Sequence, residues 1–121
     1  MTETCPSEQL PAERIVKPGE LVIRSRRDGD VHTISLAGEL DLATAGDVEQ
    51  ELIRVEATDA SVISVDLGEV TFLGSSAIRL LLHADGRSRA DSNRLALRPA
   101  PDSVMRVLRT CGVVERLPFG A

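Results

Sequence analysis

Strand-like and helix-like segments alternate along most of this chain, and this order is the strongest constraint on its fold. The pattern opens with two alternating apolar segments, LVIRSR at 21–26 and VHTISLAG at 31–38, on either side of the turn signal Asp28-Gly29. Such a pair predicts an antiparallel hairpin. Because the later strands alternate with helices, we expect an α/β fold in which helices pack on a mixed β-sheet that opens with a β-hairpin.

The middle of the chain predicts a helix, a strand and a loop. Leu42 to Glu56 carries apolar residues largely at helical spacing, and Asp41 is placed to cap that helix. SVISVDL at 61–67 is rich in β-branched residues, as a buried central strand should be. GEVTFLGS at 68–75 indicates a loop that leads into the next helix.

The last third predicts two more helices with a strand between them. One apolar helix begins around Ser75 and Ser76, and RLALRP at 94–99 follows it as a strand. Asp102 to Thr110 then predicts a short helix that stops at Gly112. The residues expected to face inward from this helix are Val104, Val107 and Leu108.

The length and composition indicate a single domain behind an N-terminal tail. A chain of 121 residues can close one hydrophobic core but not two. Residues 1–19 hold three prolines among Glu, Ser and Thr without apolar periodicity, which is typical of a flexible tail. We therefore expect a flexible tail over 1–19 and the folded domain over 20–121. Its core should be aliphatic, because the chain has two Phe and no Trp or Tyr.

Charge and cysteine content argue against several classes of function. A net charge of −5 disfavours nucleic-acid binding, which depends on clustered Lys and Arg. No apolar segment approaches the about 20 residues of a membrane span and the first residues lack a signal-peptide pattern, so we expect a cytoplasmic protein with no membrane partner. Neither Cys5 nor Cys111 has metal-ligand neighbours, so we expect no metal and no cofactor, and an inert, buried Cys111.

Ser75 and Ser76 stand where a buried strand passes through a glycine-containing turn into a helix. One interpretation is structural, because a serine oxygen at a helix N-terminus accepts a hydrogen bond from a free backbone N–H. The other is regulatory. The same N–H groups and the helix dipole tolerate a phosphate on Ser75, and its charge would prevent a closely packed partner from binding. The residues alone leave both interpretations open.

Two segments around this turn resemble the signature of the STAS domain family, typified by bacterial anti-anti-sigma factors. They are GELDLATA at 38–45 and VDLGEVTFLGSSAIRLLL at 65–82, and the resemblance extends over about residues 20–119. It implies that Ser75 is phosphorylated by a partner kinase that is also the anti-sigma factor. It further implies that only the unphosphorylated form binds this kinase and releases a sigma factor, and that a PP2C-type phosphatase resets the switch.

The resemblance also implies a partner-binding surface around Ser75. Its expected members are Asp41, Gly74, Ser75, Ser76, Ala77 and Arg79. Two of these depart from the common family pattern: Gly74 stands where an acidic residue is usual before the serine, and Ala77 replaces a glycine after the serine pair.

We also considered enzymatic and constitutive alternatives. A nucleophilic Ser75 would need a base, and neither His32 nor His83 stands at a recognisable triad spacing. No phosphate-binding glycine motif occurs either, so we expect a protein without catalytic residues. The alternative function is a constitutive, non-phosphorylated STAS interaction module, transport-associated or scaffolding, for which Gly74 is the main argument. The sequence leaves the oligomeric state open.

Overall fold

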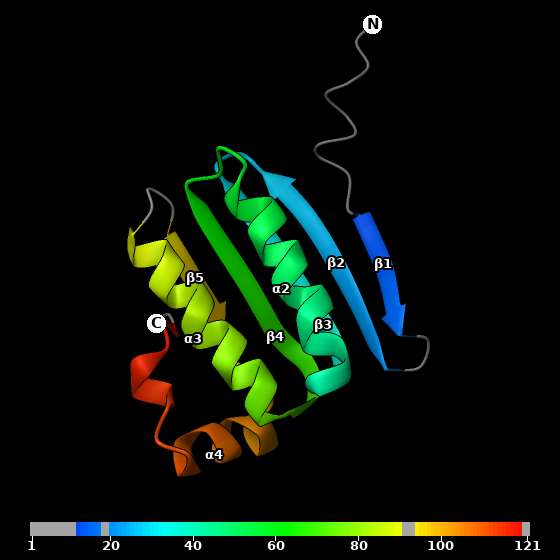
Figure 1. Ribbon diagram of the computed structural model, residues 1–121, viewed down its shortest axis with the longest axis vertical. Helices are drawn as coiled ribbons and strands as arrows, with labels where there is room; N and C mark the ends of the chain where they lie inside the picture. Colours follow the sequence, from blue (N-terminus) through cyan, green and yellow to red (C-terminus); the bar gives the residue numbers. More distant parts are fainter. Residues whose placement is uncertain (1–11, 18–19, 91–93, 120–121) are drawn as a thin grey trace, which may run out of the picture.

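The computed structural model describes residues 12–17, 20–90 and 94–119. Within these ranges the elements are β1 (Ala12–Lys17), β2 (Leu21–Asp28), β3 (Val31–Leu40), α2 (Leu42–Glu56), β4 (Val62–Leu73), α3 (Ser75–Ala90), β5 (Arg94–Arg98), α4 (Asp102–Thr110) and the 3₁₀ turn η1 (Val114–Arg116). The predicted α/β class is confirmed: helices pack on a mixed sheet, and the predicted hairpin forms its β2–β3 part (Figure 1).

The five strands lie in the sheet in the order of the sequence, β1-β2-β3-β4-β5. β2 and β3 pair antiparallel from Asp28–Val31 outwards, so that Gly29 and Asp30 form the turn. Gly29 has a φ of 62°, which glycine adopts without strain. β4 and β5 continue the sheet in parallel, because α2 and α3 return the chain to the same end each time.

The core lies between one face of the sheet and the two long helices. Figure 1 shows α2 and α3 side by side across this face, with α4 near one end of the sheet. Alternate residues of β2, β3, β5 and the first half of β4 face the helices and are buried, as with Ile34 and Leu36 of β3 and Val65 of β4. The buried hydrophobic residues are Leu, Ile, Val, Ala and Met, so the predicted aliphatic core is confirmed.

Two boundaries differ from expectation. Residues 12–17, expected to belong to a flexible tail, form β1 and pair antiparallel with β2, so the fold begins before Glu20. The predicted tail over 1–11 lies outside the described residues. The segment 68–73, expected to be a loop, continues β4 as far as Leu73. Two register irregularities against β3 break the strict alternation of β4, which is why its second half lacked a clear strand pattern.

Two side chains near the C-terminus also lie differently from expectation. Val107 was expected to face inward but is 48% exposed, and Met105 is buried on α4 alongside Val104 and Leu108. Cys111 was expected to be buried, yet it is exposed as the residue that ends α4.

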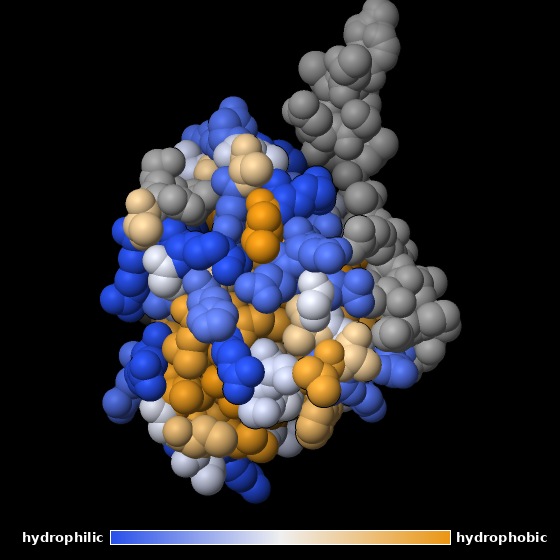
Figure 2. Space-filling model, in the orientation of Figure 1, coloured by the Kyte–Doolittle hydropathy of each residue, from blue (hydrophilic) through white to orange (hydrophobic). Residues whose placement is uncertain are grey.

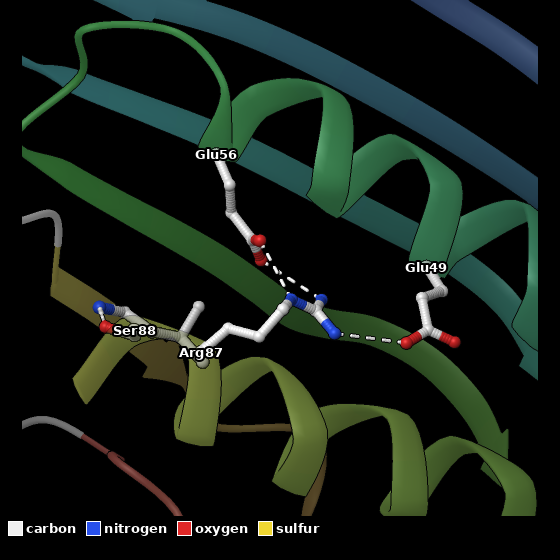
Figure 3. Close-up of polar contacts among 5 residues, drawn as sticks. Glu49, Glu56, Arg87 and Ser88 are labelled. Atoms are coloured by element: carbon white, nitrogen blue, oxygen red, sulfur yellow. Dashed lines mark hydrogen bonds and ion pairs between the residues drawn. The ribbon is translucent and has the colours of Figure 1, made fainter. Parts of the chain in front are cut away.

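An ion-pair cluster joins the two long helices at their C-terminal halves. Arg87 of α3 reaches α2, where its guanidinium donates to both carboxylate oxygens of Glu56, with N–O distances of 2.9 and 3.1 Å (Figure 3). A third guanidinium nitrogen of Arg87 donates to Glu49 at 3.2 Å. Beside it on α3, the Ser88 hydroxyl oxygen accepts from the backbone N–H of Leu95, which ties the helix to β5. These contacts fix the spacing of α2 and α3.

Candidate functional site

The site lies where two parallel strands end side by side. Leu40 of β3 pairs with Leu73 of β4, and the N–H of Gly74 donates to the carbonyl oxygen of Leu40 at 2.8 Å. The next residues, Asp41 and Ser75, lead directly into α2 and α3. The two helix N-termini therefore meet at one edge of the sheet, which is where binding sites commonly form in α/β folds.

Ser75 is the first helical residue of α3 and does not cap it. The carbonyl oxygen of Gly74 accepts from the N–H groups of Ala77 and Ile78 at 3.0 and 3.1 Å, which places Gly74 at the cap position. Ser75 is exposed, and its hydroxyl makes no hydrogen bond with another described residue. Its oxygen is therefore accessible to a modifying enzyme or to a partner.

Asp41, in contrast, holds its helix in place. Its carboxylate accepts from the N–H groups of Ala43 and Thr44 at 3.0 and 3.3 Å, and the Thr44 hydroxyl oxygen accepts from the N–H of Asp41 at 3.0 Å. This reciprocal capping box confirms that Asp41 caps α2. Asp41 is half-buried, so it can also contribute to the surface beside Ser75.

The Phe72 ring lies against Gly74. A Cβ atom at Gly74 would be 3.3 Å from Cε2 of this ring and 3.6 Å from the carbonyl oxygen of Leu40. Phe72 is nevertheless 51% exposed. The absence of a side chain at Gly74 thus leaves room for an aromatic ring next to Ser75, where an acidic side chain would give the turn a charge.

The structure brings most of the predicted surface together. Gly74 and Ser76 are half-buried and Arg79 is exposed, so these residues can line a surface around Ser75. Arg79 forms no ion pair within the part of the chain that the structure describes. Ala77 of α3 is completely buried, which contradicts its assignment as a partner contact. Its small side chain packs into the core instead.

Several residues of this surface were not predicted from the sequence. Leu42, the first residue of α2, is 82% exposed, although its position in an apolar repeat suggested that it faces the core. Phe72 was assigned to a loop. Glu20 and Glu39 were not singled out, yet their carboxylate oxygens and that of Asp41 all lie within 4.8 Å of one another. Glu39 and Leu42 lie within two residues of Asp41 in the sequence. This proximity was the available sign that they belong to the same surface.

The histidines do not take part in this site. His32 is buried on the helix-bearing side of the sheet, where its Nε2 is hydrogen-bonded to the Ser25 hydroxyl. Burial, and next the charges of Arg54 and Arg27, lower the pKa of His32, while the Glu51 carboxylate opposes them. His83 is exposed on α3, two turns beyond Ser75. The carboxylate of Asp66 accepts from the N–H of Gly68 at 2.8 Å, as expected for a residue that satisfies a local amide.

In the described residues no helix has the length and apolar character to cross a membrane.

Comparison with known proteins gives a family match. A family model described as "Mlab, STAS domain" matches residues 23–118. The anti-sigma-F factor antagonist RsfB of Mycobacterium tuberculosis is 31% identical over 64 residues, which cover 53% of this chain and 52% of RsfB. The chain thus spans about half the length of this curated relative.

Solved structures share the fold at low sequence identity. An anti-sigma factor antagonist from Mycobacterium paratuberculosis matches with a TM-score of 0.73 and 23% identity, covering 87% of this chain and 89% of that chain. The Bacillus cell fate determinant SpoIIAA in its phosphorylated form matches with a TM-score of 0.61 and 18% identity, covering 82% of this chain and 91% of that one. At these identities the likeness establishes the arrangement of strands and helices.

Proposed function

The chain belongs to the STAS domain family, and from this membership we propose that it is an anti-sigma factor antagonist. Such a protein binds an anti-sigma factor and thereby releases a sigma factor. The names of the relative RsfB and of the Mycobacterium paratuberculosis structure support this role. We propose further that the partner is an anti-sigma factor with serine kinase activity, and that the chain binds it only when Ser75 is unphosphorylated.

The observation that carries this proposal is the exposed hydroxyl of Ser75 at the start of α3, which makes no hydrogen bond with another described residue. A phosphate there adds up to about two negative charges without displacing a buried side chain. A partner packed closely over the turn would have to desolvate those charges, so binding would be lost while the fold is kept. SpoIIAA, which shares the fold, has been solved in a phosphorylated form, and this supports the same chemistry here.

The switch needs an enzyme for each direction. The kinase binds ATP and transfers its γ-phosphoryl group to the Ser75 oxygen, which releases ADP and the hydroxyl proton. A PP2C-type phosphatase hydrolyses the phosphoserine with water to serine and inorganic phosphate. The chain itself contributes the accessible oxygen and the surface around it, and we propose that it has no catalytic residue. It acts in the cytoplasm, where sigma factors act.

The test is to incubate the purified chain with ATP and each anti-sigma factor kinase encoded by its genome, followed by intact mass and site mapping. We expect one phosphate on Ser75, none on Ser75→Ala, and loss of kinase binding in the phosphorylated chain. Ser75→Asp should lose binding while its circular dichroism and thermal transition stay unchanged. Normal binding by a folded Ser75→Asp variant would refute the switch.

One observation favours a second candidate, a constitutive STAS interaction module in a scaffold or a transport system. Gly74 gives the turn no acidic group for a kinase to recognise, and Phe72 covers that position. In this case no kinase of the panel would phosphorylate the chain, and Ser75→Ala would have no regulatory effect in cells. Intact-mass measurement of the chain isolated from cells would distinguish the two candidates.

A further inference from the structure

We propose that the Ser75 surface recognises its protein partner through two apolar side chains, Leu42 and Phe72, beside a cluster of carboxylates from Glu20, Glu39 and Asp41. The partner then presents apolar side chains next to a Lys or Arg that reaches this cluster. This inference rests on the proposed function and specifies the chemistry of the partner. We call the five residues the anchor surface.

The apolar part of the anchor surface is unusually exposed. Leu42 and Phe72 are 82% and 51% exposed, whereas the core-facing apolar residues of the same elements, such as Leu52 and Val70, are completely buried. Leu42 lies two residues after Leu40 and Phe72 one residue before Leu73, and Leu40 and Leu73 pair where β3 and β4 end. Large apolar side chains exposed at one end of a domain mark sites of protein association. In Figure 2 the apolar surface gathers over the N-terminal ends of α2 and α3 and along α4, while charged side chains dominate the opposite half of this face.

The acidic part gives the surface its charge preference. The carboxylate oxygens of Glu20, Glu39 and Asp41 lie within 4.8 Å of one another. Among the side chains of residues 20–90 and 94–119, none forms an ion pair with these three. Three negative charges at this spacing repel one another, and an incoming cation relieves that repulsion. A Lys or Arg of the partner would therefore gain more here than at an isolated carboxylate.

The two parts are continuous with each other and with Ser75. Phe72 pairs with Glu39 across β3 and β4, and the N–H of Glu39 donates to the carbonyl oxygen of Glu20 at 2.8 Å. Leu42 directly follows Asp41, whose chain neighbour Leu40 is hydrogen-bonded to Gly74. A partner that covers Ser75 at this end of the sheet is thus close to both the apolar side chains and the carboxylates.

The charged and the apolar groups of the anchor surface act on different steps of binding. Rim charges mainly steer the encounter, whereas desolvated apolar contacts mainly set the rate of dissociation. A phosphate on Ser75 lies beside the apolar anchors, so it disrupts the contact that holds the complex together. It does not need to repel the partner, and a basic partner therefore remains compatible with the switch.

The experiment uses the kinase that binds the wild-type chain and measures association and dissociation rates with purified proteins. We expect Leu42→Ala and Phe72→Ala each to weaken binding by about tenfold or more, mainly through faster dissociation. Ile53→Ala and Val107→Ala, which truncate side chains that are 50% and 48% exposed elsewhere, are the matched controls and should stay within about twofold. The thermal transition of each variant verifies folding.

The contribution of the carboxylates is tested with the double variant Glu20→Gln/Glu39→Gln. The double variant Glu69→Gln/Glu115→Gln is the control for net charge. We expect the first pair to slow association by about tenfold at low salt and to flatten its salt dependence, and the second to do neither. If Leu42→Ala and Phe72→Ala bind normally while Ser75→Asp does not, the anchor surface is refuted and the proposed function stands. If no kinase binds the wild type, both fail.

The cluster could also bind a divalent cation. If Ca²⁺ or Mg²⁺ shifts the resonances of Glu20, Glu39 and Asp41 at millimolar concentration, and the Gln pair leaves kinase association unchanged, the cluster is a metal site and the basic partner is refuted. Unshifted resonances together with slower association support the proposal.

Discussion

Asp41 and Ser75 follow the ends of neighbouring strands, and only Asp41 uses its side chain to hold its helix. Asp41 satisfies two backbone N–H groups of α2, whereas the cap of α3 is the backbone of Gly74. Asp41, at the cap position of α2, and Ser75, the first residue inside α3, are therefore under different constraints. Asp41 cannot change without cost to the fold, and Ser75 can.

We expect Asp41→Ala to lower the free energy of unfolding by about 1–2 kcal/mol, because two N–H groups lose their acceptor. Ser75→Ala should change it by less than about 0.5 kcal/mol, since no contact between described residues is lost. Urea unfolding of the two variants measures both values. An equal loss in the two variants would show that Ser75 also acts as a cap.

At the scale of elements, the Arg87 cluster joins α2 to α3. We expect Arg87→Met to lower the free energy of unfolding by about 1–2 kcal/mol, because the largely buried Glu56 loses a bidentate partner while the methionine keeps the apolar stem. Arg106→Met on α4, which removes an exposed charge, is the control. Urea unfolding at two salt concentrations measures the effect, and equal stabilities for the two variants would refute the role of the cluster.

The β2–β3 hairpin under α2 carries a pH-dependent contribution to stability. Burial, Arg54 and Arg27 lower the pKa of His32 in the folded state below its ordinary value of about 6.5, so the unfolded chain binds the proton more readily. The contribution is complete above pH 6.5 and declines as the pH falls below it. We expect the free energy of unfolding to fall over this range.

The control for this dependence is the other histidine of the chain, the exposed His83. His83→Asn should keep the decline below pH 6.5, and His32→Asn should remove most of it. Urea unfolding between pH 8 and pH 5 measures both variants. A decline that persists in His32→Asn would assign it to the carboxylates.

At the scale of the whole molecule, β1 is an edge strand that pairs with β2 alone in the sheet. We expect removal of residues 1–17 to leave a folded domain, because the remaining strands β2 to β5 stay paired with one another. The deletion turns β2 into an open edge, which should favour self-association. Circular dichroism and sedimentation velocity measure the two effects, and an unfolded product would show that β1 is essential.

Much of this architecture was predictable because local pattern and tertiary role agree. The hairpin at Gly29, the helix from Leu42 to Glu56 and the helix from Asp102 to Thr110 form as predicted, since apolar spacing and end signals coincide there. The second half of β4 was missed because its bulges break the alternation. β1 was missed because its strand character depends on pairing with β2.

The part of the site that comes from the two sequence motifs was predictable, and the part that comes from other segments of the chain was less so. The motif resemblance brought Asp41, Gly74 and Ser75 together, as the structure does. Glu20 and Phe72 belong to the same surface only because the start of β2 lies beside the ends of β3 and β4. Their wide separation in the sequence gives no local sign of that. Ala77 is buried because it is the third residue of α3, which starts at Ser75, and this position faces the core.

The sequential order of the sheet also bears on how the protein reaches its native state. Each strand after β1 pairs with the strand made just before it, and the partners farthest apart in sequence, such as Leu40 and Leu73, are separated by about thirty residues. Loops of this length close at small entropic cost, so we expect rapid folding for a mixed sheet. As a ribosome extends the chain, each new strand meets a template that is already complete, and none has to wait for the C-terminus.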